Sequence, residues 1–276
     1  MGKLDGRVAL ITGGARGQGR SHARTLAAEG ADIVIGDICE SFPHTSYPGS
    51  THADMQESVK LIEELDRRCV AVQTDVSTSD GARRLTEAAI SEFGKIDILV
   101  INHGIVAGGV PTWELEEDQW DEELRVNLKG VWLMCKYVVP YMIERARGSI
   151  VMTASAAGLM GYSNITHYTA AKHGVVGITR ALANETAKLG IRVNAVCPTA
   201  VDSPMMDNEW AFSLFGGPGG TREDQLAGTR SLNAQPVPLI AMQDVSNMVL
   251  FLASDDARYI TGLAHLVDAG SYNKFP

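Results

Sequence analysis

A tyrosine and a lysine one helical turn apart carry the clearest chemical signal in this 276-residue sequence. Tyr168 and Lys172 lie in a helix-like stretch, and Ser155 precedes Tyr168 by thirteen residues. Side chains at positions i and i+4 project from the same face of a helix. An ammonium group beside a phenol favours the phenolate, so we expect Lys172 to lower the pKa of Tyr168. Such a pair can exchange a proton with an alcohol or carbonyl group, although an ordinary surface helix shows the same spacing.

A glycine-rich turn follows the first predicted strand and leads directly into a helical pattern. Glycines let the backbone turn tightly and approach a pyrophosphate, whose charge is favoured at a helix N-terminus. Asp37 ends the second predicted strand, eighteen residues after the last glycine of this turn, where a carboxylate accepts hydrogen bonds from an adenosine ribose. The combination predicts a dinucleotide site. Its candidate residues in the turn are Gly13, Arg16, Gly17, Gln18 and Gly19.

The same residues bear on the choice between NAD and NADP. Asp37 repels a ribose 2′-phosphate, because like charges in a low-dielectric pocket cost several kcal/mol. Arg16 is the one nearby residue that would attract this phosphate. Asp37 competes directly for the ribose edge, so the sequence favours NAD as the cofactor.

The elements that must position these residues alternate along the chain. Short β-branched runs, several of them continuously apolar, are typical of strands in a parallel sheet that is buried on both faces. They are predicted at 7–12, 32–36, 70–74, 96–101, 149–153, 191–196 and 264–267. Amphipathic helices are predicted at 18–29, 53–68, 78–93, 117–146, 167–189 and 242–254. This alternation predicts one Rossmann-type, doubly wound α/β domain over residues 1–276, with a seven-stranded parallel sheet and helices on both faces.

Two segments interrupt this alternation. The stretch 39–51, with Pro43, Pro48 and Gly49, is longer than a strand-to-helix loop requires. The stretch 199–234 is rich in Met, aromatic residues and Gly, and we interpret it as an apolar lid followed by a glycine hinge. A helix packed statically on the core is the alternative. The lid contains no Arg or Lys between residues 204 and 221 to bind a carboxylate or phosphate, which favours an apolar substrate.

Composition excludes several classes of protein. A formal net charge of −9 and a pI near 5.3 argue against nucleic acid or anionic lipid as the main partner. The four cysteines show no paired or metal-type spacing and the seven histidines are scattered, so we expect reduced thiols and no metal site. The N-terminus lacks an apolar signal region, and no stretch is long and apolar enough to span a bilayer. We expect a cytoplasmic protein.

These motifs together resemble the short-chain dehydrogenase/reductase family over essentially the whole chain. The pattern includes Gly-x-x-x-Gly-x-Gly, Asp75-Val76 after the third strand, Asn102-His103-Gly104 after the fourth, and Asn127 in the following helix. The resemblance implies that Asp75 holds the adenine amino group, that Val76 adds backbone contacts, and that Asn102 braces the central strand. The family usually has Ala at position 103, so His103 departs from its pattern. The remaining cofactor-binding residues implied are Gly104, Tyr168, Lys172, Pro198, Val201 and Ser203.

The resemblance also implies a catalytic role for each of four residues. Tyr168 takes the alcohol proton while hydride leaves the carbinol carbon for NAD. Lys172 lowers the pKa of Tyr168 and holds the nicotinamide ribose, and Ser155 donates a hydrogen bond to the substrate oxygen. Asn127 anchors a water that connects Lys172 to solvent. Asn is unfavourable inside a helix, which itself suggests a purpose for this residue. His167 lies about 100° from Tyr168 around the helix and is left out of the predicted site.

The insert at 39–51, the 198–206 segment and the aromatic lid look most like an actinobacterial subgroup. These proteins resemble carveol dehydrogenases, are associated with the redox peptide mycofactocin, and hold NAD so tightly that it is reoxidised in place. The resemblance implies an apolar, terpenoid secondary alcohol as substrate, a mycofactocin-type electron acceptor and a homotetramer. An NADPH-dependent ketone or 3-oxoacyl reductase of the same family is the first alternative. A non-catalytic NAD-binding sensor or scaffold is the second.

Overall fold

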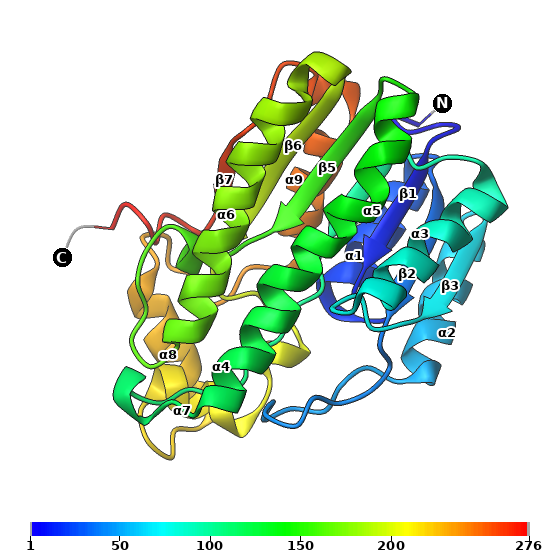
Figure 1. The fold of residues 1–276 in the computed structure, drawn as a ribbon. Helices are drawn as coiled ribbons and strands as arrows, with labels where there is room; N and C mark the ends of the chain where they lie inside the picture. Colours follow the sequence, from blue (N-terminus) through cyan, green and yellow to red (C-terminus); the bar gives the residue numbers. More distant parts are fainter. Residues whose placement is uncertain (1, 275–276) are drawn as a thin grey trace.

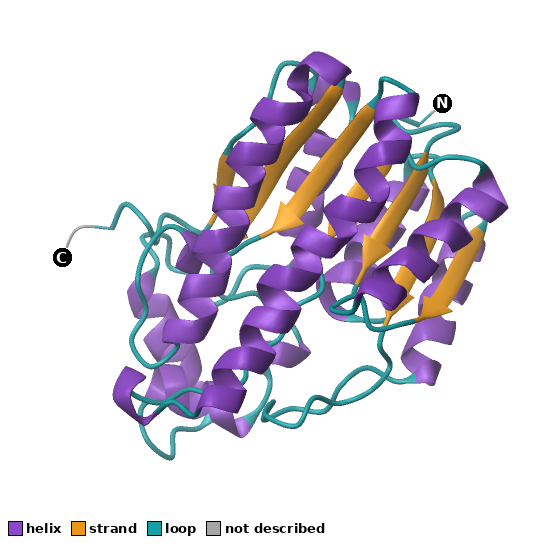
Figure 2. Cartoon of the chain, viewed as in Figure 1, coloured by secondary structure: helices purple, strands orange, loops and turns teal. Residues whose placement is uncertain are grey.

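A seven-stranded parallel sheet forms the centre of the molecule in the computed structural model, which describes residues 2–274 (Figures 1 and 2). Every neighbouring pair of strands is parallel, and the strand order is β3-β2-β1-β4-β5-β6-β7. The strands are β1 (Val8–Thr12), β2 (Asp32–Asp37), β3 (Cys69–Gln73), β4 (Ile98–Ile101), β5 (Gly148–Thr153), β6 (Ile191–Pro198) and β7 (Ala264–Val267).

Helices cover both faces of this sheet (Figure 1). One layer contains α3 (Ser79–Phe93), α5 (Gly130–Glu144) and α6 (Thr166–Thr186), and its buried side chains form one apolar cluster with the strands. The other layer contains α1 (Gly17–Ala28), α2 (His52–Glu63) and α9 (Met242–Ala253), with a second cluster. Because both faces are covered, the central strands are mainly apolar, and all of β1, β4 and β5 is buried.

The predicted fold class and the seven predicted strands are therefore confirmed. Of the predicted range 1–276, residues 1, 275 and 276 lie outside the part that the structure describes. No helix between residues 2 and 274 is long and apolar enough to cross a membrane.

Two predicted helices differ in detail. The helix predicted at 53–68 ends at Glu63, because the chain leaves the helical conformation and Asp66 adopts a φ of 55°. The helix predicted at 117–146 is continuous but irregular. It consists of α4 (Glu117–Leu124), a π-helical segment at Arg125–Lys129 and then α5. The π-helical segment contains Asn127, and such segments often occur at functional sites.

The carboxyl ends of the strands converge on one edge of the sheet, at the bottom of Figures 1 and 2. The strand order reverses between β1 and β4, and in open parallel sheets ligands bind at this switch point. The 39–51 insert and the two short helices α7 (Glu209–Gly216) and α8 (Arg222–Leu232) lie at the same edge. The two segments that interrupt the alternation therefore both border the predicted site.

Candidate active site

The glycine turn after β1 has the backbone geometry of a phosphate-binding loop. Gly13 and Gly17 have φ values of 67° and 58°, a region that disfavours other residues. A Cβ atom on Gly19 would lie 1.9 Å from the carbonyl oxygen of Gly13, so the first turn of α1 packs directly on the loop. Amide groups at the N-terminus of α1 are thereby directed toward a cavity at the switch point, as a pyrophosphate requires.

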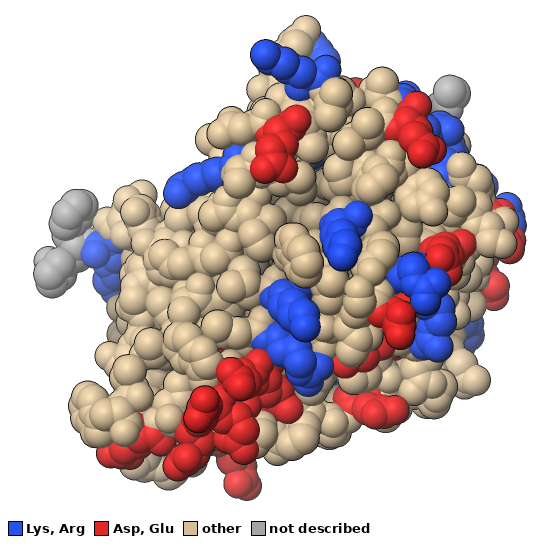
Figure 3. Space-filling model, viewed as in Figure 1, with Lys and Arg blue, Asp and Glu red and all other residues tan. Residues whose placement is uncertain are grey.

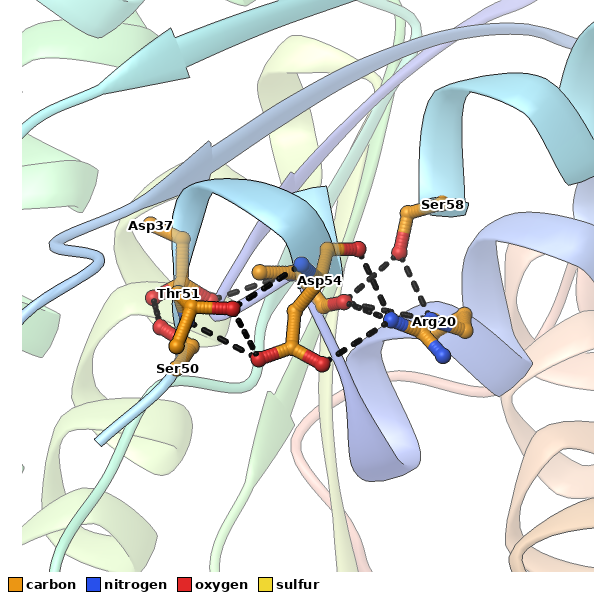
Figure 4. A network of polar contacts seen from close by, with 7 residues as sticks. Arg20, Asp37, Ser50, Thr51, Asp54 and Ser58 are labelled. Carbon is orange, nitrogen blue, oxygen red and sulfur yellow. Dashed lines mark hydrogen bonds and ion pairs between the residues drawn. The ribbon is translucent and has the colours of Figure 1, made fainter. Parts of the chain in front are cut away.

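Asp37 is held in a fixed orientation at the end of β2. Its Oδ2 accepts a hydrogen bond from the Ala15 amide at 3.0 Å, and its Oδ1 accepts one from the Ser50 hydroxyl at 2.5 Å. Figure 4 shows this contact beside the start of α2, where Thr51 and Asp54 form a reciprocal cap. Ser50 belongs to the insert, so the insert helps to hold the carboxylate expected to recognise the cofactor ribose.

The insert forms one wall of the cofactor cavity. The Arg16 guanidinium donates a hydrogen bond to the Pro48 carbonyl oxygen and so connects the glycine turn to the insert. Arg16, Gly17 and Gln18 line the cavity from α1. From the insert and its approach, the cavity is lined by Glu40, Phe42, Thr45, Tyr47, Gly49 and Ser50. Sequence reasoning had assigned this segment no position in the site.

Four more of the predicted cofactor residues, Asp75, Val76, Asn102 and Gly104, line the same cavity. The Asp75 carboxylate is oriented by the Ser77 amide at 2.9 Å and by the Arg125 guanidinium at 3.1 Å. The Asn102 amide nitrogen lies 3.3 Å from the carbonyl oxygens of both Thr12 and Gly13, which agrees with its predicted bracing role. Val76 and Gly104 complete this part of the lining.

His103, which departs from the family pattern, ties two elements together. Its Nδ1 lies 2.7 Å from the Thr12 hydroxyl, and its Nε2 lies 3.2 Å from the Val126 carbonyl oxygen. A carbonyl oxygen only accepts, so Nε2 carries the proton and Nδ1 accepts from the hydroxyl. Burial lowers the pKa of His103 to about 4, so the ring is neutral near pH 7. It links β1 to the π-helical segment.

Ser155, Tyr168 and Lys172 converge on a second cavity that adjoins the first. The Ser155 hydroxyl accepts a hydrogen bond from the Ala157 amide at 3.1 Å, which leaves its own proton free to be donated. Lys172 is 3% exposed, and its Nζ donates to the Thr153 carbonyl oxygen at 2.9 Å. This Nζ lies 5.5 Å from the centroid of the Tyr168 ring. The predicted trio is therefore assembled on one side of one cavity.

The expected direction of the Tyr168 pKa is wrong for the protein alone. Burial raises the pKa of this phenol, and a hydrogen bond with the Ser155 hydroxyl acts in the opposite direction. Burial also lowers the pKa of Lys172, while the charge of Glu123 acts in the opposite direction. The i, i+4 spacing correctly placed the two side chains together, but it carried no information on how little water surrounds them.

Asn127 holds the backbone that follows β4. Its side chain is fully buried, with Oδ1 accepting from the Ile105 amide and Nδ2 donating to the Ile105 carbonyl oxygen, each at 2.8 Å. The predicted water between Asn127 and Lys172 stays a prediction. The two side chains do face one point, because a Cβ atom on Gly104 would lie 3.1 Å from Asn127 Oδ1 and 3.4 Å from Lys172 Nζ.

Three residues that sequence reasoning missed hold the next two peptides. The Tyr47 hydroxyl accepts from the Val106 amide at 3.2 Å, and Glu123 Oε2 accepts from the Ala107 amide at 2.7 Å. His167 Nε2, 3.2 Å from the Ala107 carbonyl oxygen, donates to it. A glutamate four residues before Asn127 was the available signal for Glu123, because both lie on one helical face.

The two cavities adjoin and share part of their lining. Gln18, Asn102, Gly104, Ser203 and Met205 line both, while Pro198 and Val201 line the second, so these predicted residues are brought together. Beyond Tyr168 the second cavity is mainly apolar. Its apolar side chains include Ile165, Met206, Trp210, Leu214, Phe215 and Leu232.

The predicted apolar helix and glycine segment form a tightly packed hairpin. A Cβ atom on Gly228 of α8 would lie 1.9 Å from the Phe215 carbonyl oxygen of α7, so the two helices touch through their backbones. Gly217 and Gly219, with φ values of 89° and 72°, form the turn between them. The glycines therefore join two packed helices, and the predicted movement as a lid would have to involve the whole hairpin.

Within residues 2–274 no cluster of His, Cys, Asp and Glu is arranged to hold a metal ion. The four cysteines are free thiols. The polar groups of the site are those of the two adjoining cavities.

Known proteins share both the sequence and this arrangement. Residues 7–213 match the family model of short chain dehydrogenases. A (-)-trans-carveol dehydrogenase from Rhodococcus erythropolis is 43% identical over 98% of this chain and 99% of its own length. The crystal structure of a carveol dehydrogenase from Mycobacterium avium in complex with NAD has a TM-score of 0.97 and 42% identity, covering 99% of this chain and 100% of that one.

A short chain dehydrogenase from Mycobacterium paratuberculosis, bound to NAD, has a TM-score of 0.91 and 36% identity, covering 99% of this chain and all of that one. The resemblance drawn from the motifs is thus confirmed by similarity along nearly the whole chain. The protein belongs to the short-chain dehydrogenase family.

Proposed function

We propose that this enzyme is an NAD-dependent dehydrogenase that oxidises apolar secondary alcohols to ketones. The observation that carries the proposal is the convergence of Ser155, Tyr168 and Lys172 on an apolar cavity that opens into the cavity containing Asp37. The first cavity fits a dinucleotide, because the glycine turn leaves room where a Cβ atom would collide and Asp37 is fixed at the ribose end. Relatives described as carveol dehydrogenases and structures bound to NAD support the same reaction.

Each of the three catalytic side chains has a separate role in the reaction. NAD, when bound, supplies the acceptor for the hydride of the carbinol carbon. Tyr168 takes the hydroxyl proton, and Ser155 donates a hydrogen bond that stabilises the developing negative charge on the substrate oxygen. Lys172 contributes a positive charge beside the phenol and holds the ribose hydroxyls. The positive charge of a bound nicotinamide also lowers the pKa of Tyr168, which opposes the rise caused by burial.

NAD is preferred over NADP because both oxygens of Asp37 are already held by donors of the protein. The carboxylate therefore cannot turn away from a 2′-phosphate without breaking hydrogen bonds to Ala15 and Ser50. The Arg16 guanidinium, the nearby positive charge, donates a hydrogen bond to the Pro48 carbonyl oxygen instead of facing that phosphate. The same contacts weigh against an NADPH-dependent reductase, and the intact catalytic trio weighs against a non-catalytic sensor.

The substrate is an apolar, terpenoid-like secondary alcohol. The α7–α8 hairpin contributes Trp210, Leu214 and Phe215 to the cavity that Tyr168 also lines. Burial of a hydrocarbon ring against these hydrophobic side chains is favourable. Among the lining residues of this cavity, Lys172 is the only charged side chain, and it belongs to the catalytic group. A carboxylate or phosphate on the substrate would have no partner there.

Further proposals extend those made from the sequence. The insert contacts the glycine turn and Asp37, so it retains NAD and slows its exchange. Reoxidation of the retained cofactor by a mycofactocin-type acceptor, assembly as a homotetramer, and a cytoplasmic location complete the proposal. The acceptor and the homotetramer rest on the family resemblance, whereas the cytoplasmic location and the mobility of the α7–α8 hairpin as a lid are proposed from the sequence.

The test is oxidation of a panel of apolar secondary alcohols, followed both as free NADH at about 340 nm and as reduction of an artificial dye. Dye reduction without free NADH supports an alcohol dehydrogenase with retained cofactor. Free NADH formed at a comparable rate supports the dehydrogenase but contradicts slow exchange. Failure to oxidise any alcohol of the panel, with carboxylated or sugar alcohols accepted instead, would overturn the proposed substrate class.

A further inference from the structure

The buried carboxylate of Glu123 lies behind the catalytic group and was not part of the predicted site. The outward face of its helix, α4, is acidic: Glu117, Asp118 and Asp121 are exposed, in the region where acidic side chains gather in Figure 3. Glu123 turns inward instead and is 0% exposed. A carboxylate without access to water requires compensating partners, because desolvation of a charge is costly.

Both oxygens of Glu123 face hydrogen-bond donors. Oε2 accepts from the Ala107 amide at 2.7 Å, and Oε1 accepts from Asn127 Nδ2 in a short contact. His167 Nε2 lies 3.9 Å from Oε2, but its proton points to the Ala107 carbonyl oxygen. Burial raises the pKa of Glu123 to about 8, while the hydrogen bond from the Ala107 amide and the charge of Lys172 act in the opposite direction, so the carboxylate carries its negative charge in the alkaline range.

The compensating positive charge is Lys172. Its Nζ is buried and donates to one neutral carbonyl oxygen, and among the described residues no carboxylate lies within salt-bridge distance of it. Asn127 stands between the two charges, with Nδ2 directed to Glu123 and Oδ1 facing the same point beside Gly104 as Lys172 Nζ. Two opposite charges separated by one amide in a dry interior interact strongly, because little solvent screens them.

We propose that Glu123 is a positioning residue whose buried negative charge keeps Lys172 in its ammonium form and thereby sets the pH range of the reaction. The inference rests on the proposed function, in which Tyr168 and Lys172 act on the alcohol. The titratable groups that face Glu123 from the surrounding elements are Lys172, His167 and Tyr168 of α6, Tyr47 of the insert and Glu122 of α4.

The sign of the effect follows from the charge. A nearby negative charge raises the pKa of a lysine and of a tyrosine, and Glu123 acts in this direction on both Lys172 and Tyr168. Removal of the charge therefore moves both titrations to lower pH. Loss of packing or of a hydrogen bond alone lowers the rate at every pH and does not move the profile.

The first experiment compares the pH dependence of kcat/KM for alcohol oxidation in the wild type with that in Glu123→Gln and Glu123→Met. We expect the profile to shift to lower pH by about one unit, the order of magnitude that loss of one nearby charge produces in a poorly solvated site. Glu123→Asp, which retains the charge, should restore most of the wild-type position. A profile that stays in place in both neutral variants would overturn the proposal.

The matched control is the neighbouring carboxylate. Glu122 is also buried, but its Oε2 accepts from the His44 amide at 3.2 Å and lies 3.3 Å from the His44 ring, away from Lys172. Glu122→Gln should leave the position of the profile unchanged. An equal shift in this variant would show a general charge effect of α4 and contradict a specific role for Glu123.

A second experiment measures the pair without using activity. Thermal unfolding of Lys172→Met, Glu123→Met and the double variant forms a double-mutant cycle. Lys172→Met leaves the carboxylate without its counter-charge. The further substitution Glu123→Met should therefore lower Tm less than it does in the wild type, or raise it. Additive losses of Tm would contradict the pairing. An active Tyr168→Phe enzyme would instead contradict the proposed function, and the unfolding cycle would still report on the two charges.

Discussion

The cofactor cavity and the substrate cavity share a boundary at Gly104 but are built in opposite ways. In the cofactor cavity, polar side chains are held by other parts of the protein: Asp37 by Ala15 and Ser50, and Asp75 by Ser77 and Arg125. In the substrate cavity, the wall contributed by α7 and α8 is mainly apolar.

This contrast has a consequence for specificity. A site with oriented polar groups rejects a wrong ligand strongly, because one misplaced charge or unpaired donor costs several kcal/mol. An apolar wall discriminates weakly, since one methylene is worth about 1–3 kcal/mol. We therefore expect strict selection of the cofactor and broad acceptance of alcohols.

The largest effect is expected at the junction of the cavities. Tyr168→Phe removes the group that exchanges a proton with the substrate but keeps the ring that lines the cavity. The rate should fall by roughly two to four orders of magnitude, the usual contribution of general acid–base catalysis, while NAD binding is retained. Single-turnover kinetics and cofactor titration measure the two quantities. Retention of most activity would contradict the proposed mechanism.

The cofactor preference should change next most strongly. Asp37→Ala removes the charge that opposes a 2′-phosphate, so the ratio of kcat/KM for NAD over NADP should fall by about one to two orders of magnitude. Ser50→Ala removes one of the donors that hold this carboxylate and should reduce the ratio much less. The comparison between the cavities fails if Asp37→Ala leaves the preference intact.

The rigidity of the cofactor side should also appear in the pH dependence of stability. Burial lowers the pKa of His103 from 6.5 to about 4, so between these values the unfolded chain binds a proton that the folded protein does not. Stability should therefore fall as the pH drops from about 6.5 to about 4, by at most roughly 3 kcal/mol for this residue. His103→Gln should make the dependence of Tm on pH shallower, whereas exposed His173→Gln should not.

The smallest effect is expected in the apolar wall. Trp210 reaches from α7 toward the loop after β4, because a Cβ atom on Gly109 would lie 3.2 Å from its indole ring. Trp210→Phe replaces the indole by a smaller ring and weakens this contact. The KM for compact alcohols should therefore rise by about three- to tenfold, with little change in kcat. Bulky alcohols should be affected less. A loss comparable to that of Tyr168→Phe would show that this wall does more than shape the cavity.

Several features of the fold and the site could be predicted from the sequence because their signals are local. Continuous apolar runs located the strands, and the i, i+4 spacing placed Tyr168 beside Lys172. The glycine spacing and Asp37 located the dinucleotide cavity. Asn127 was identified from the family resemblance, with its unfavourable position inside a helix as a supporting sign, and the structure gives it hydrogen bonds to both polar atoms of the Ile105 backbone.

Other features depend on contacts between segments far apart in the chain. The insert contacts Asp37 through Ser50 and the loop after β4 through Tyr47. The sequence of the insert does not indicate which residues it contacts. The pKa of Tyr168 rises because packing excludes water, and packing is not encoded in the spacing of two residues. The α7–α8 glycines turned out to join packed helices for the same reason.

The sequence by itself determined the order of strands and helices, the glycine turn and the placement of Tyr168 and Lys172 on one helical face, because periodicity and spacing act over a few residues. Only the tertiary structure decided which charges are buried together. Glu123 and Lys172 are 49 residues apart in the chain, with α5 and β5 between them, yet they lie on either side of Asn127 once α4 and α6 pack. Electrostatic interactions depend on distance and on the surrounding water, and both are set when the elements come together.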